Sequence, residues 1–166
     1  MELCLEVIFD FSEVVNERRR MEMEARKRII FPVDVPTAEE AHKYIILFNG
    51  LIGVVKLGFE IIAHAFLTGA QIFKMVLEET DLDVMFDIKG DDIPQTIAGL
   101  AKQVALYGQN RIFGFTIHCN AGRKAIQDAV QAVKDNFKGP NPPMVIVVTL
   151  LTSLNESDFE DLDIKA

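Results

Sequence analysis

The sequence predicts an α/β protein of the (β/α)8 TIM-barrel type, truncated to about five β/α units and preceded by a helical extension. Short apolar runs alternate with helical segments five times, which is typical of a parallel sheet. Every apolar run ends in polar residues, and the active site of a barrel lies at that end of its strands. No glycine-rich phosphate-binding fingerprint follows the first strand, which disfavours a dinucleotide-binding, doubly wound sheet.

The composition of the chain limits the classes of function that it can have. The chain of 166 residues suffices for one ordinary domain, and 49% hydrophobic with 25% charged residues is the profile of a soluble globular protein. The net charge of −8 disfavours a general nucleic-acid-binding role. Without a membrane-length apolar run or a secretory signal, a cytoplasmic protein with no membrane contact is expected. Cys4 and Cys119 lack a metal-ligand spacing, which agrees with a reduced cytosolic setting.

Two regions differ in pattern. Residues 1–27 are expected to form a helical N-terminal extension, and residues 28–166 a partial barrel domain. In the extension, opposite charges four residues apart, such as Glu22 and Arg26, predict a solvated helix. Residues 18–20 are all arginine, and the interleaved glutamates favour an exposed helix face over a nucleic-acid contact.

The barrel domain is expected to consist of alternating strands and helices. The strands are short apolar runs at residues 29–33, 53–55, 83–88, 111–117 and 144–148. The helices follow them at residues 37–48, 59–79, 93–107, 122–137 and from about 156 onward. Thr37 and Glu40 form a capping box that predicts the start of the first helix. The second helix should break near Gly69, and the third should end at Gly108.

Polar side chains end the expected strands. In chain order they are Asp34, Lys56, Asp87 with Lys89, His118, and Thr149 with Thr152. Residues i and i+2 of a strand face the same side, so Asp87 and Lys89 should meet at the mouth of the sheet. Lys56 would join them from the neighbouring strand, and alternating charges at close range shift one another's pKa values. The alternative is an isolated strand-end ion pair worth about 0–1 kcal/mol, but a shared rim is the simpler account.

Other polar residues have ordinary structural alternatives. Asp92 is placed where it could cap the next helix. His118 is expected to be a rim residue that makes hydrogen bonds, because no second histidine has ligand spacing. His42 and His64 are expected on helix surfaces, and Cys119 is expected to be a small packing residue.

One stretch resembles a known family. Residues 87–96 read DIKGDDIPQT, which is similar to the DxKxxDIPxT signature of the orotidine 5′-phosphate decarboxylase family. Four more segments resemble the family's strands in order and spacing, namely 31–34 (FPVD), 55–58 (VKLG), 117–122 (IHCNAG) and 148–153 (VTLLTS). The resemblance covers roughly residues 28–162. DxKxxD alone also occurs in related sugar-phosphate enzymes, and the continuation Ile93-Pro94-x-Thr96 favours the orotidylate enzyme.

The resemblance implies a lyase of de novo pyrimidine biosynthesis that converts orotidine 5′-phosphate to uridine 5′-phosphate. Lys89 would donate a proton to C6 of the pyrimidine as carbon dioxide leaves. Asp87 would lie against the substrate carboxylate and disfavour that ground state, and Lys56 and Asp92 would complete a Lys-Asp-Lys-Asp array. Such an array can stabilise a carbanion without an electron sink, and no metal or organic cofactor is implied.

The resemblance also implies residues that bind the nucleotide substrate. Asp34 and Lys56 would hold ribose hydroxyls. Thr152, or Ser153 beside it, would contact the pyrimidine.

Two residues are implied to serve a partner. Asp92 and Thr96 would reach into the site of a neighbouring subunit, so a homodimer with shared active sites is expected. Asp91 stands where family members often carry histidine, and it adds negative charge beside the array.

The length departs from the family pattern. A complete barrel has about 250 residues, whereas this chain stops after its fifth expected strand, before the family's phosphate-binding loops. Five strands leave the first and the fifth unpaired on one side, so Ile30, Val33, Val145 or their neighbours should meet water or a partner. The 166-residue chain alone is therefore expected to associate or to be marginally stable, with little or no decarboxylase activity.

Two other functions stay open at this point. One is a metal-dependent sugar-phosphate decarboxylase or aldolase of the same suprafamily, with Asp87, Lys89 and Asp92 in new roles. The other is a non-catalytic, truncated remnant. Dependence on a divalent metal would distinguish the first alternative.

Overall fold

The computed structural model of the chain describes residue 21, residues 25–108, residues 111–155 and residue 158. Its strands are β1 (Ile30–Val33), β2 (Val54–Gly58), β3 (Asp83–Gly90), β4 (Ile112–His118) and β5 (Met144–Val148). Its helices are α2 (Ala38–Phe48), α3 (Phe59–Thr68), α4 (Ile72–Glu79), α5 (Pro94–Tyr107), the 3₁₀ turn η1 (Cys119–Ala121) and α6 (Gly122–Asn136).

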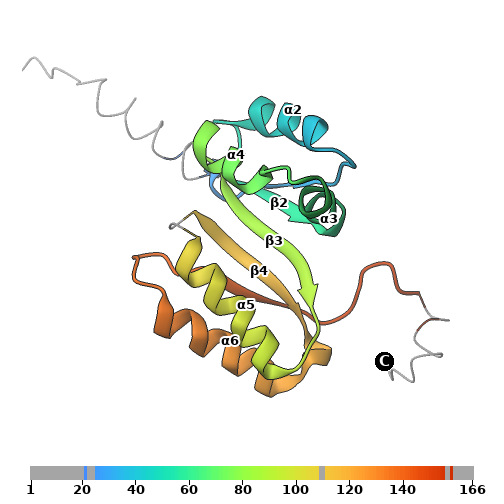
Figure 1. The fold of residues 1–166 in the computed structure, drawn as a ribbon, viewed down its shortest axis with the longest axis vertical. Coiled ribbons are helices and arrows are strands. Elements are labelled where there is room, and N and C mark those ends of the chain that lie inside the picture. The colour runs from blue at the N-terminus through green and yellow to red at the C-terminus, as the bar shows by residue number, and fades with distance from the viewer. Residues whose placement is uncertain (1–20, 22–24, 109–110, 156–157, 159–166) are drawn as a thin grey trace, which may run out of the picture.

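The five strands form one parallel sheet in the order β1-β2-β3-β4-β5 (Figure 1). Each strand pairs with its predecessor in the chain, whereas a doubly wound sheet reverses its strand order at a switch point. Right-handed crossovers in one constant direction carry every connecting helix to the same face of the sheet. This is the arrangement of consecutive (β/α)8 barrel units, so the predicted fold class is confirmed.

The core lies between the sheet and its helices. Val55 and Leu57 of β2 pack with α2 and α4 in one buried cluster, and Phe115 and Ile117 of β4 pack with α5 and α6 in another. Phe73 and Phe86 join the two clusters, and their ring centroids lie 5.5 Å apart. Because side chains alternate along a strand, the residues between these core positions face the side of the sheet away from the helices.

The two edge strands follow the prediction only in part. Ile30 on β1 and Met144 and Val147 on β5 are exposed. Val33, however, is 0% exposed, and the expectation that it would meet water was wrong. It belongs to the positions that face the helices, and it packs in the same cluster as Ala41 of α2.

Several local predictions can be compared directly with the structure. Thr37 caps α2 and accepts a hydrogen bond from the backbone N–H of Glu40 at 3.3 Å. Gly69 breaks the second helical segment with a left-handed φ of 75°, and α3 and α4 meet at a bend of 101°. β2 runs on to Gly58, beyond the predicted end of the strand at Lys56, because Leu57 and Gly58 continue the pairing with β3. Lys56 therefore lies inside a strand.

Two predicted helices fall largely or wholly outside the described residues. The N-terminal extension is described only at residues 21 and 25–27, and the helix expected from about residue 156 only at residue 158. In the part of the chain that the structure describes, no single helix has the length and hydrophobicity to span a membrane. The bent pair α3 and α4 passes that test only when both helices are counted together.

Candidate functional site

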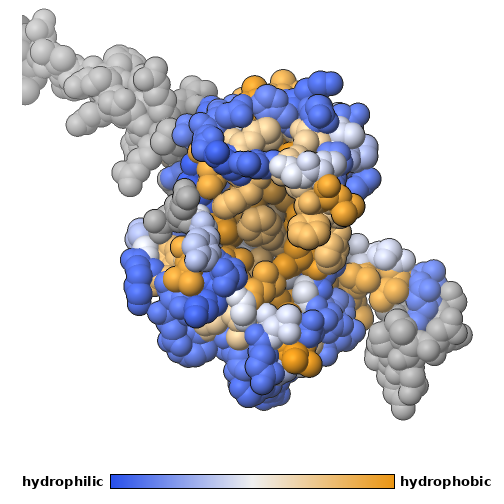
Figure 2. Space-filling view, in the orientation of Figure 1, coloured by the Kyte–Doolittle hydropathy of each residue, from blue (hydrophilic) through white to orange (hydrophobic). Residues whose placement is uncertain are grey.

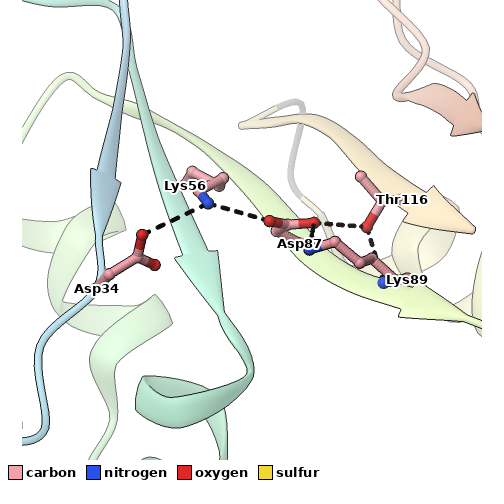
Figure 3. A network of polar contacts seen from close by, with 5 residues as sticks. All are labelled: Asp34, Lys56, Asp87, Lys89 and Thr116. Atoms are coloured by element: carbon pink, nitrogen blue, oxygen red, sulfur yellow. Dashed lines mark hydrogen bonds and ion pairs between the residues drawn. The ribbon is translucent and has the colours of Figure 1, made fainter. Parts of the chain in front are cut away.

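Four charged residues form a continuous row on the face of the sheet away from the helices (Figure 3). Lys56 Nζ lies 3.6 Å from Asp34 Oδ2 and 3.0 Å from Asp87 Oδ2. Lys89 Nζ lies 2.9 Å from the other oxygen of that carboxylate, Asp87 Oδ1. Acidic and basic groups thus alternate from Asp34 to Lys89, and we call these four residues the charge array.

Strand pairing brings the array together. Lys56 pairs with Pro32 of β1 on one side and with Met85 of β3 on the other. The carboxylates of Asp34 and Asp87 stand two residues beyond these partners, towards the carboxyl ends of their strands. Residues two apart share a face, so both carboxylates flank the ammonium of Lys56. The sequence prediction of a shared rim is confirmed for these residues.

An irregularity in β3 shapes the far end of the array. Phe86 pairs with Phe115 and Gly90 pairs with Ile117, so residues 87–89 lie opposite Thr116 alone. Lys89 has a φ of 44°, in the left-handed region that residues other than glycine rarely adopt. The predicted contact between Asp87 and Lys89 is confirmed. The prediction assumed regular strand geometry at these residues, and that assumption was wrong. A β-bulge of this kind re-aims side chains, and bulges are common beside active sites.

Asp87 is the centre of the array. It is 8% exposed and accepts hydrogen bonds from Lys89, Lys56 and the hydroxyl of Thr116. Burial acts to raise the pKa of this carboxyl, but the three hydrogen bonds together outweigh it and hold the pKa below its usual value. Asp87 is therefore ionised at neutral pH and stands as a fixed negative charge between two ammonium groups.

The depressed pKa of Asp87 makes stability depend on pH. Its ionised form stabilises the fold above the ordinary carboxyl pKa of 3.8, and this contribution is lost as the pH falls through the lower, folded value. We expect Asp87→Asn to lower the unfolding free energy at pH 7 and to flatten its decline in acid. Urea unfolding between about pH 2 and pH 7 measures both effects.

Asp128→Asn is the matched control, because Asp128 pairs with Lys124 on the surface of α6 and exposed pairs contribute little. It should leave the pH profile of the wild type nearly unchanged. Parallel profiles for the wild type and Asp87→Asn would contradict the assignment of acid lability to Asp87.

Asp92 lies outside the array within this chain. It is exposed, makes no ion pair with Lys56 or Lys89, and its Oδ1 accepts a hydrogen bond from the adjacent backbone N–H of Ile93 at 2.6 Å. The alternative that Asp92 caps the next helix is wrong, because the N-cap of α5 is Ile93 and no side chain caps that helix.

The other predicted substrate-binding residues stand apart from the charge array. Thr96 is exposed on the first turn of α5, and Thr152 and Ser153 are exposed in the segment after β5. None of the three has a hydrogen bond to an array residue among the described contacts, so the structure does not bring them into the array.

The sequence reasoning missed Thr116. This residue is 2% exposed and hydrogen-bonds both to the carboxylate of Asp87 and to the backbone N–H of Lys89. The available signal was its position two residues before His118, which placed it on the same strand face as the polar rim. His118 itself makes the predicted hydrogen bond, with Nδ1 accepting from the backbone N–H of Asn120 at 3.3 Å.

Residues proposed to have structural roles behave largely as expected. His42 is on α2 and pairs with Glu79 of α4 at 2.8 Å. Cys119, which was expected to be a packing residue, is only partly buried, and its thiol donates a hydrogen bond to the carbonyl of Thr149 at 3.1 Å. Among the described residues, no group of three or more His, Cys, Asp or Glu side chains is arranged to hold a metal ion.

A second feature is an apolar cavity on the helix side of the sheet. It has a volume of about 330 Å³ and is lined by residues of β2, α3, α4 and β3, among them Ile61, Phe73 and Phe86. Figure 2 shows hydrophobic residues across the hollow between the α2–α4 group and the α5–α6 pair. None of the four array residues lines the cavity, so the charge array and this apolar cavity lie on opposite sides of the sheet.

Comparison with known proteins gives a consistent result. The family model described as "Orotidine 5′-phosphate decarboxylase / HUMPS family" matches residues 27–166. Among curated proteins, orotidine 5′-phosphate decarboxylase of Gloeothece citriformis is 36% identical over 132 residues, which cover 80% of this chain and 52% of the relative. The enzyme of that name from Syntrophotalea carbinolica is 30% identical over 146 residues, 87% of this chain and 57% of the relative.

Solved structures agree with this. The crystal structure of orotidine 5′-phosphate decarboxylase from Lactobacillus acidophilus has a TM-score of 0.67 at 25% identity, and the match covers 81% of this chain and 58% of that one. An uncharacterized conserved protein from Geobacillus kaustophilus has the same TM-score at 26% identity, over 80% of this chain and 59% of that one. The chain spans about half the length of the curated relatives it matches.

Proposed function

The chain belongs to the orotidine 5′-phosphate decarboxylase / HUMPS family, and from this premise we propose that its charge array serves the decarboxylation of orotidine 5′-phosphate to uridine 5′-phosphate. The observation that carries the proposal is the unbroken row from Asp34 to Lys89, centred on a buried, ionised Asp87. A fixed row of alternating charges suits a reaction in which negative charge moves from a carboxylate to a ring carbon.

The array supplies both charges that the reaction needs. The substrate carboxylate on C6 would lie against Asp87, where like charges raise the energy of the ground state. The C6–carboxyl bond then breaks, carbon dioxide leaves, and the bonding electron pair stays on C6. The ammonium of Lys89 stabilises this carbanion and donates the proton that forms the new C6–H bond. Solvent returns a proton to Lys89, whose side chain is 36% exposed.

The remaining array residues hold the centre in place. Lys56 binds the second oxygen of Asp87, and this contact helps keep that carboxylate ionised. Asp34, exposed beyond β1, and Lys56 would bind ribose hydroxyls. Thr152 or Ser153, which follow β5 on the same edge of the sheet, would contact the pyrimidine.

We also propose a homodimer that shares its active sites. Asp92 and Thr96 are exposed on either side of Pro94 at the start of α5, and neither reaches the array of its own chain. Ile93 between them is 60% exposed, an apolar surface that a partner subunit would cover. A carboxylate from the partner's Asp92 would then complete the Lys-Asp-Lys-Asp array beside Lys89.

The proposed reaction needs no metal or organic cofactor and belongs to cytoplasmic pyrimidine biosynthesis. The test is to follow the loss of orotidylate absorbance with a complete form of the enzyme that carries all eight β/α units, called the full-length protein below, with and without EDTA. We expect conversion at the same rate in both. Conversion that requires a divalent metal would instead indicate the sugar-phosphate branch of the suprafamily. A folded protein that binds the nucleotide without converting it would indicate a non-catalytic remnant.

A further inference from the structure

The buried hydroxyl of Thr116 links Asp87 and Lys89, the two residues proposed to act on the substrate carboxylate and on C6. Thr116 Oγ1 donates to Asp87 Oδ1 at 3.0 Å and accepts from the backbone N–H of Lys89 at 2.8 Å (Figure 3). A hydroxyl has one donor and two acceptor positions, so its donor is fully committed to the Asp87 carboxylate. Thr116 is 2% exposed, which means that water cannot readily replace either bond.

The β3 bulge explains why Lys89 needs this partner. With residues 87–89 opposite Thr116 alone, the regular ladder between β3 and β4 is interrupted there. The backbone N–H of Lys89, which is partly buried, takes the hydroxyl as its acceptor instead, and leaving such an N–H unpaired would cost free energy. The φ of 44° at Lys89 is also unfavourable for a residue with a Cβ, and such a backbone persists only where its surroundings hold it.

The Thr116 hydroxyl holds the side chain of Asp87 as well as the backbone of Lys89. Asp87 Oδ1 accepts from both Thr116 and Lys89 Nζ, while Oδ2 accepts from Lys56. Thr116 thus sets the orientation of the Asp87 carboxylate and the backbone from which Lys89 extends.

We propose that Thr116 is a positioning residue, whose hydroxyl holds the Asp87 carboxylate and the Lys89 ammonium in the geometry needed for proton delivery to C6. This inference rests on the proposed decarboxylase function. The plainer alternative is that Thr116 only satisfies polar atoms in the sheet and contributes to stability. The two differ in what a variant without the hydroxyl does to the turnover number of the folded protein.

Two matched pairs isolate the hydroxyl. Thr116 and Thr116→Val have nearly the same shape, and Thr116→Ser and Thr116→Ala differ by one oxygen. In the full-length protein we expect Thr116→Val and Thr116→Ala to lower kcat by about 10- to 100-fold, the effect of a small misplacement of reacting groups. KM should change by less than about threefold, because the ground-state contacts to the nucleotide stay in place. Thr116→Ser should keep most of the wild-type kcat.

A readout without substrate separates this inference from the proposed function. Carbon-13 NMR of the Asp87 carboxyl, assigned with Asp87→Asn, should show its titration midpoint moving upward in Thr116→Val and Thr116→Ala but not in Thr116→Ser. If Thr116→Val does not fold, the Ser and Ala pair still decides the matter. Equal kcat and equal midpoints within each pair would overturn the proposal. A wild-type protein that lacks decarboxylase activity but shows the NMR shifts would refute the function and leave the hydroxyl's hold on Asp87 intact.

Discussion

Replacing Lys89 by alanine is expected to abolish orotidylate decarboxylation in the full-length protein while leaving the fold intact. The lysine is proposed both to stabilise the C6 carbanion and to protonate it, and losing one such group commonly lowers kcat on the order of 10²-fold or more. Alanine and lysine both carry a Cβ, so the substitution adds no new strain at the φ of 44°. Steady-state kinetics with circular dichroism of both proteins checks the expectation.

Lys102→Ala is the matched control for this experiment. Lys102 is an exposed lysine on α5, and removing it changes the net charge by the same amount. It should leave kcat within about twofold of the wild type, as expected for a surface substitution away from the site. Near-normal turnover of Lys89→Ala would remove Lys89 from the mechanism.

Mixing two inactive variants is expected to restore activity. If the partner's Asp92 completes the array, a heterodimer of Lys89→Ala and Asp92→Ala chains contains one site with every proposed residue. Random exchange makes about half of the dimers heterodimers, so roughly a quarter of the wild-type activity should return in a closed, two-fold dimer. Native mass spectrometry confirms exchange, and the absorbance assay measures recovery.

The control mixes Lys89→Ala with Asp87→Ala. These two residues contact each other within one chain, so neither site of that heterodimer is complete and no activity should return. Heterodimers of Lys89→Ala and Asp92→Ala that form but stay inactive would mean that the site is built within one chain.

The sequence allowed the fold and most of the array to be predicted because the pattern is repetitive. Apolar runs that alternate with amphipathic segments predict parallel β/α units, and polar residues at the strand ends predict a common rim. Asp34, Lys56 and Asp87 could be placed together on that basis, and the structure joins them through Lys56. The ends of the strands were predicted less accurately. At β2, for example, pairing with β3 continues beyond the apolar run.

The bulge and its hydroxyl could not be predicted in the same way. Position 89 is a lysine, and a lysine in a strand gives no signal of a left-handed backbone. The backbone conformation of Lys89 depends on the neighbouring strand. Threonine is a favourable strand residue, so Thr116 within β4 looked like ordinary strand sequence. The role of Asp92 is proposed to depend on a second chain. The family resemblance implied that role, whereas the local sequence around Asp92 offered only the capping alternative.

The most direct test of the central claim uses orotidine 5′-phosphate labelled with carbon-13 in its carboxylate, incubated in D₂O with wild-type protein and with Lys89→Ala. We expect the wild type to release labelled carbon dioxide and to form uridine 5′-phosphate with one deuterium at C6, because the exchangeable ammonium of Lys89 delivers it. The variant should release label at a rate lower by at least about 10²-fold. No release by the wild type, or equal release by both proteins, would contradict the proposed role of Lys89 in decarboxylation.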